Sequence, residues 1–177
     1  MMVDQEVWID ESRPLRVSFD THGWRFHPGA RGIVGTPAEA FLRLVAVRGD
    51  TREVVEGVAG LRGRVALSTP EQALELVRLF TLPATHYLFP DSRRVEPAPA
   101  DGAPGPARYT ADYAAKVGIR PASARREGDG FVVERALLEA GGALVHARER
   151  VAADGAYALE EARTLDPRSP IVFPAYE

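Results

Sequence analysis

The chain has 177 residues, of which 45% are hydrophobic and 27% are charged. This length and composition are typical of one globular domain and exclude a disordered or fibrous chain. A formal net charge of -3 excludes a general electrostatic attraction to nucleic acid or anionic membranes, and the absence of cysteine excludes disulfides, thiolate metal sites and cysteine nucleophiles.

The N-terminal segment carries acidic residues where a signal peptide has basic residues followed by an apolar run. No segment has the roughly 18 uninterrupted apolar residues that a membrane-spanning helix requires. We therefore expect a soluble, cytoplasmic protein. Lys116 is the only lysine among the 22 basic residues, a bias that indicates a GC-rich, bacterial genome and weakens arginine clusters as signs of function.

Alternating apolar residues predict two or three short antiparallel strands between Val7 and Phe26. Turn-forming residues interrupt this pattern at 12–14 and at 21–23. We therefore expect the N-terminal part to begin with an antiparallel sheet.

The segment 37–48 carries helix signals, because Thr36 can cap the first turn, Pro37 stands at the first helical position and Gly49 can end the helix. The alternative is a strand over 41–48, since leucine, valine and phenylalanine suit both structures. The capping signals favour the helix, which we predict.

The segment 70–81 repeats this opening, with Thr69 as the cap, Pro70 in the first position and Gln72 in the reciprocal capping position. An apolar stripe at helical spacing follows. The sequence therefore predicts a helix over 70–81.

A segment rich in proline, alanine and glycine at 96–107 can bury little surface and predicts a flexible loop. We expect a single α+β domain over 1–177, in which this loop separates an N-terminal part (1–95) from a C-terminal part (108–177).

The segment after this loop predicts a short helix over 110–117, with Tyr113 and Val117 on one face and Gly118 as the C-terminal cap. A basic segment that begins with proline follows, so the region 109–127 also has the outline of a helix-turn-helix. A second helix there would be too short to lie comfortably in the major groove of DNA.

The segment 131–164 predicts three antiparallel strands, because Gly141-Gly142 and Asp154-Gly155 are two-residue hairpin signals. The alternative is two helices, over 134–142 and 143–155, since both stretches contain good helix formers.

Two-residue turns at these sites would set the register of the three strands. One face would then carry Glu134, Glu149 and Glu160 in a single cross-strand row. The opposite face would carry a basic cluster, made of Arg135, Arg148, Arg150, Arg163 and His146.

Three facing carboxylates repel one another, so their charge needs relief. Three arrangements would each reduce this repulsion: a bound divalent cation, a raised pKa that makes one glutamate a general acid, or plain solvation. We favour solvation. The basic cluster could bind a phosphate, a carboxylate or an acidic partner, or it could be a solvated face on which Glu161 pairs with neighbouring arginines.

These elements together predict an α+β fold with a mostly antiparallel sheet. Its C-terminal three-stranded meander, at about 131–164, is expected to be covered by two or three helices, at about 37–48, 70–81 and 110–117.

We expect a non-catalytic binding or protein-interaction module, of the inhibitor, immunity or regulatory type, that uses the charged face of the C-terminal sheet. One alternative is a small hydrolase or isomerase that uses the sheet glutamates with His146 or His86. The other is DNA binding around 109–127.

The expected partner is another protein or a small anionic ligand, and a homodimer is compatible with the sequence. We expect no cofactor, no metal, no membrane association and no nucleic acid. Four histidines, no thiols, and the lack of a phosphate loop or a nucleophile elbow support these exclusions.

Overall fold

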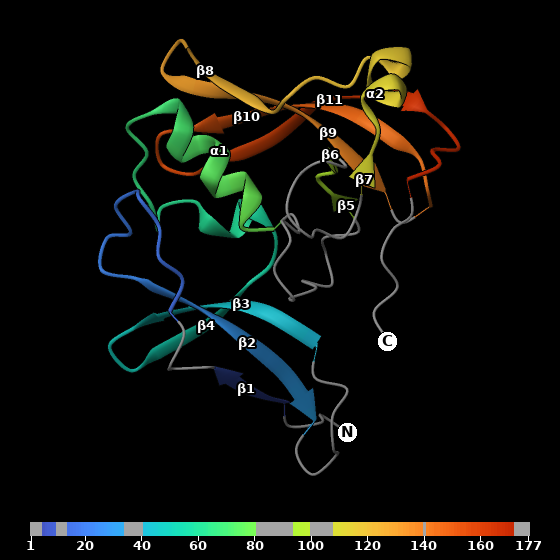
Figure 1. Cartoon of the computed structure of the whole chain (residues 1–177). Coiled ribbons are helices and arrows are strands. Elements are labelled where there is room, and N and C mark those ends of the chain that lie inside the picture. Colours follow the sequence, from blue (N-terminus) through green and yellow to red (C-terminus); the bar gives the residue numbers. More distant parts are fainter. Residues whose placement is uncertain are drawn as a thin grey trace.

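The computed structural model describes residues 5–9, 14–33, 41–80, 94–99, 108–139 and 141–171 (Figure 1). It is a mixed α+β structure with mostly antiparallel strands, as predicted. One sheet is formed within residues 5–55 and a larger sheet within residues 94–166, with helix α1 between them (Figure 1). No helix in these described ranges is long and apolar enough to cross a membrane.

The N-terminal sheet is antiparallel and has the strand order β1-β2-β3-β4. Its strands are β1 (Gln5–Ile9), β2 (Arg25–Ile33), β3 (Phe41–Arg48) and β4 (Thr51–Val55). The predicted antiparallel sheet is thus confirmed, although 14–19 lies in no strand and only borders β2, where the Leu15 N–H donates to the Phe26 carbonyl.

The predicted helix over 37–48 is wrong from residue 41 onward, where the chain forms β3; residues 37–40 lie outside the described ranges. Residues 44–47 are all buried, and β3 pairs with β2 on one side and with β4 on the other. Non-local pairing and burial on both faces therefore override the local helix signals. Gly49-Asp50, a two-residue hairpin signal, joins β3 to β4 through the Arg48–Thr51 pair.

The helix predicted over 70–81 is confirmed as α1 (Pro70–Arg78). Thr69 and Gln72 form the expected capping box, in which the Gln72 N–H donates to Thr69 Oγ1 (3.3 Å) and the Thr69 N–H donates to Gln72 Oε1 (3.3 Å). Its buried face carries Ala73, Leu76 and Val77. A short 3-10 helix, η1 (Val58–Leu61), precedes it.

The predicted C-terminal meander is confirmed, and the alternative of two helices is wrong. The sheet has the order β11-β10-β9-β5, and β8 also pairs with β9. Its strands are β5 (Arg94–Val95), β8 (Ser123–Glu127), β9 (Gly130–Glu139), β10 (Leu144–Ala152) and β11 (Tyr157–Asp166).

The predicted helix at 110–117 is confirmed as α2 (Ala111–Val117), and the left-handed Gly118 (φ 80°) ends it. The second helix of a helix-turn-helix is absent, because Ser123–Glu127 is strand β8 and pairs with β9. Within the segment 96–107 predicted as a loop, Ala98–Pro99 forms the short strand β6, which pairs in parallel with β7 (Arg108–Tyr109). Residues 100–107 lie outside the described ranges.

The two faces of the C-terminal sheet have different surroundings. We call the face toward α1 and the N-terminal sheet the inner face. It joins the main core, which includes Phe26, Leu44, Leu76, Phe131 and Val151. We call the opposite face the outer face; α2 covers one end of it, where a smaller cluster contains Ala136, Leu138, Leu144 and, from α2, Tyr113 and Val117.

Each hairpin of the meander has a three-residue loop instead of the two-residue turn that we predicted. The Glu139 N–H donates to the Ala143 carbonyl (2.9 Å), and the Ala152 N–H donates to the Ala156 carbonyl (2.8 Å). Gly142 and Gly155, each at φ 83°, supply the left-handed residue that closes such a loop. The extra loop residue shifts the β9–β10 register by one and moves every side chain of one strand to the other face.

We expect Gly155→Ala to destabilise the protein much more than Gly142→Ala, although both glycines have φ 83°. A Cβ at Gly155 would lie 2.6 Å from Val65 Cγ2 and 3.1 Å from the Leu61 carbonyl oxygen, whereas at Gly142 no atom lies within 4 Å. Gly142→Ala should cost about 1–2 kcal/mol of backbone strain, and Gly155→Ala roughly 1–3 kcal/mol more because of overlap. Urea unfolding of both variants measures this difference, and equal losses would contradict it.

Candidate functional site

The predicted row of three glutamates does not form. Glu134 lies opposite Arg148, and Glu149 lies opposite Val133. The ladder between β10 and β11 steps from the Arg148–Glu161 pair to the Glu149–Leu159 pair, which leaves Glu160 in a β-bulge. Glu134 and Glu160 therefore lie on the outer face, and Glu149 lies on the inner face.

The predicted basic cluster is divided in the same way. His146, Arg148 and Arg150 alternate along the outer face of β10, and Arg163 lies opposite His146. Arg135 lies on the inner face and is buried, because the shifted register pairs it with Ala147. The other proposed histidine, His86, lies outside the described residues.

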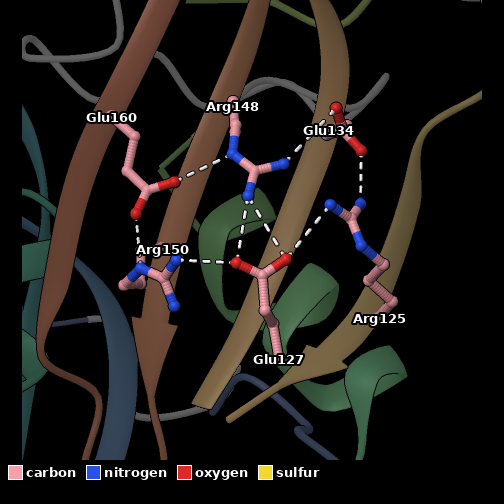
Figure 2. A network of polar contacts seen from close by, with 6 residues as sticks. All are labelled: Arg125, Glu127, Glu134, Arg148, Arg150 and Glu160. Carbon is pink, nitrogen blue, oxygen red and sulfur yellow. Dashed lines mark hydrogen bonds and ion pairs between the residues drawn. The ribbon is translucent and has the colours of Figure 1, made fainter.

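Six side chains of β8, β9, β10 and β11 form an ion-pair network (Figure 2). It lies on the outer face, at the end not covered by α2. We call it the outer network; its members are Arg125, Glu127, Glu134, Arg148, Arg150 and Glu160. It contains equal numbers of arginines and glutamates, so its formal charge is zero.

Arg148 is the centre of the outer network, because it contacts all three glutamates. Its Nε donates to Glu160 Oε2 (2.9 Å) and its Nη2 donates to Glu127 Oε1 (3.1 Å). Its Nη1 lies 3.9 Å from Glu134 Oε1. A single guanidinium on the middle strand thus joins carboxylates from both neighbouring sides.

Two further arginines close the network around Arg148. Arg150 Nη2 donates to Glu127 Oε1 (2.8 Å), and Arg150 Nε donates to Glu160. Arg125 Nη2 donates to Glu127 Oε2 (3.2 Å), and Arg125 Nη1 donates to Glu134. Each glutamate is therefore held by at least two arginines, which restricts its rotamers.

The outer network is partly open to solvent, with exposed side-chain fractions from 25% at Arg148 to 48% at Arg125. The hydrogen bonds from Arg150 lower the pKa of Glu127 and of Glu160. The hydrogen bond to Glu160 raises the pKa of Arg148 and of Arg150. All four groups are therefore held in their charged forms.

A second polar cluster lies on the inner face, and its centre is a buried ion pair. Arg135 Nε donates to Glu149 Oε2 (2.7 Å) and Arg135 Nη2 donates to Glu149 Oε1 (2.9 Å), with side chains only 3% and 2% exposed. The Tyr157 hydroxyl donates to Glu149 Oε1 (2.9 Å). Burial, followed by the charge of Glu149, raises the pKa of Tyr157 and keeps it a donor.

Glu96 extends this inner cluster to α1. Glu96 Oε2 lies 3.6 Å from Arg135 Nη1 and accepts from Arg78 Nε (2.9 Å). The hydrogen bond to Glu96 raises the pKa of Arg78. Ion pairs thus connect α1 and the chain after β5 to strands β9 and β10, and the hydrogen bond from Tyr157 adds β11. This arrangement stabilises the fold.

Sequence reasoning missed the inner cluster because it assumed two-residue turns. One signal could have found it: Glu149 interrupts the apolar alternation of Val145, Ala147 and Val151 on β10. A buried carboxylate needs a cationic partner, and Arg135 interrupts the corresponding alternation on β9. A three-residue loop between β9 and β10 sets the register that places Arg135 and Glu149 on the same face.

The arrangement of these carboxylates fits ion pairing better than metal binding. Among the described residues, no group of three or more histidines, aspartates and glutamates could hold a metal ion.

Comparison with known proteins adds no functional assignment: the chain matches no protein-family model, no curated protein and no solved structure.

We expect Glu149→Leu to destabilise the protein by about 3–5 kcal/mol, because the buried Arg135 loses both hydrogen bonds to this carboxylate. The double variant with Arg135→Met should recover most of this loss, since it removes the buried cation that has lost these bonds. Arg148→Met, in the partly exposed outer network, should cost less than Glu149→Leu. Chemical unfolding of the four proteins tests this, and a double variant no more stable than Glu149→Leu would contradict it.

The outer network should make stability fall in acid. Glu127 and Glu160 have lowered pKa values in the folded state, so their contribution is complete above the unfolded pKa of about 4.3 and is lost as the pH falls through the folded values. Thermal unfolding from neutral to acidic pH should show a flatter loss for the double variant Glu127→Gln, Glu160→Gln. The control, Asp50→Asn, changes an exposed carboxylate in the β3–β4 turn and should retain the wild-type slope. Equal slopes in all three proteins would contradict the assignment.

Proposed function

We propose that this protein is a non-catalytic interaction module, of the inhibitor, immunity or regulatory type, that docks another protein on the outer network. The observation that supports this most is the position of Arg148, which contacts three partly exposed glutamates at once. Side chains that are already ordered lose less conformational entropy on binding. Such a surface is prepared for recognition before the partner arrives.

The chemistry of the outer network also favours binding over catalysis. A general acid needs a raised carboxyl pKa, and the arginines lower the pKa of Glu127 and Glu160. A small anion would compete with carboxylates that each arginine already contacts. A protein with alternating charges could instead extend the existing pattern, and charge complementarity of this kind gives specificity and a fast association rate.

Affinity purification from the source organism, with Arg150→Glu as the test variant, would examine this proposal. Arg150 is 41% exposed, so its reversal changes the surface and spares the core. Arg16→Glu, an equal charge change at an exposed position outside both sheets, is the control. Both variants should give the wild-type circular dichroism spectrum.

We expect the partner that binds the wild type and the Arg16→Glu control to bind Arg150→Glu at least about tenfold more weakly. Binding to the wild type should also weaken as salt is added. A partner that binds all three proteins equally would overturn the proposed docking surface.

A further inference from the structure

Strand β11 (Tyr157–Asp166) is an open edge of the C-terminal sheet. It pairs with β10 on one side, and no strand in the described part of the chain pairs with its other side. Residues 158–164 are all exposed, whereas the residues of β10 alternate between buried and half-buried. An edge of this kind presents free backbone N–H and C=O groups to any strand that fits beside it.

β11 carries charged side chains and bulges, which protect an edge against pairing, but it lacks the other common protections. It is ten residues long and contains neither proline nor lysine. The ladder with β10 is irregular at Glu160 and again at Leu165. In the second half of the strand, the residues from Glu161 to Thr164 continue without interruption. This second half is therefore the part of the edge that is best shaped for pairing.

Two charges on this half of β11 take no part in the outer network. Glu161 lies opposite Arg148, but Arg148 contacts Glu127, Glu134 and Glu160 instead. Arg163 lies opposite His146. Neither Glu161 nor Arg163 makes an ion pair within the described ranges. Their side chains lie on the outer face, one residue before and one residue after Ala162.

These charges are complementary to themselves under a twofold axis. If two β11 strands pair in antiparallel orientation about Ala162, Glu161 of each copy lies opposite Arg163 of the other copy. Opposite charges in facing positions stabilise a sheet, and like charges destabilise it. A shift of the axis to Glu161 or to Arg163 would place identical charges together, so this charge pattern selects one register.

We propose that two copies of this chain associate through β11, antiparallel and centred on Ala162, and so form one continuous sheet. The interface is isologous, because the same patch serves both copies. The twofold axis is perpendicular to the sheet, so both outer networks lie on the same side of the dimer. A partner with two matching surfaces could bind both networks at once.

Charge reversal at the interface tests the dimer. Glu161→Arg and Arg163→Glu each place like charges opposite one another, so each variant alone should be monomeric in sedimentation or light-scattering measurements at concentrations where the wild type is a dimer. An equimolar mixture of the two variants should dimerise, since every reversed side chain then faces an opposite charge. The chain that carries both reversals should also dimerise with itself.

Arg16→Glu, which reverses a charge away from β11, should dimerise as the wild type does. The proposal is overturned if the wild type is monomeric at every concentration, if the single reversals dimerise normally, or if their mixture remains monomeric. Because Glu161 and Arg163 are exposed, these changes leave the core intact, and circular dichroism would verify this. Partner binding to the outer network is measured separately, so either proposal can fail alone.

Discussion

The buried ion pair between Arg135 and Glu149 is the constraint on which the C-terminal sheet depends. Both side chains are almost fully enclosed, and an unpaired charge at such depth would cost several kcal/mol. A slip of one residue between β9 and β10 would place Arg135 and Glu149 on opposite faces of the sheet and break both of their hydrogen bonds. The pair thus selects the register that the three-residue loops also favour.

This register divides the charges of the meander into two groups with different physical roles. On the inner face, Glu96 and Tyr157 complete the hydrogen bonding of the buried pair and connect it to neighbouring elements. On the outer face, water screens the network around Arg148, so each ion pair there contributes little to stability. What the outer network gains is order, because each carboxylate has at least two cationic partners. That order is the basis for proposing a recognition surface.

The open edge of β11 and the outer network are neighbours, and the bulge at Glu160 connects them. The bulge turns Glu160 toward Arg148 and Arg150, and it also leaves Glu161 and Arg163 outside the network. The bulge at Glu160 therefore completes the outer network and leaves the charges of Glu161 and Arg163 available for the proposed dimer. The proposed docking surface and the proposed dimer use different residues of the same strand.

The sequence by itself determined the elements whose signals are local. The capping box of Thr69 and Gln72 predicted α1, and Gly118 marked the end of α2. The turn signals Gly141-Gly142 and Asp154-Gly155 marked three strands in the meander. These signals depend on hydrogen bonds within a few residues of the chain. The predicted caps are present in the folded protein.

The tertiary structure alone decided the β3 strand, the register of the meander and hence the membership of both charged clusters. The apolar residues of 41–48 suit both a helix and a strand, and pairing between β2 and β4 overrode the local helix signals. A glycine pair permits a loop of two or of three residues, and the difference of one residue exchanges the faces. The charges of Arg135 and Glu149 resolve this ambiguity only when both strands pack against the core, because desolvation is what makes their pairing necessary.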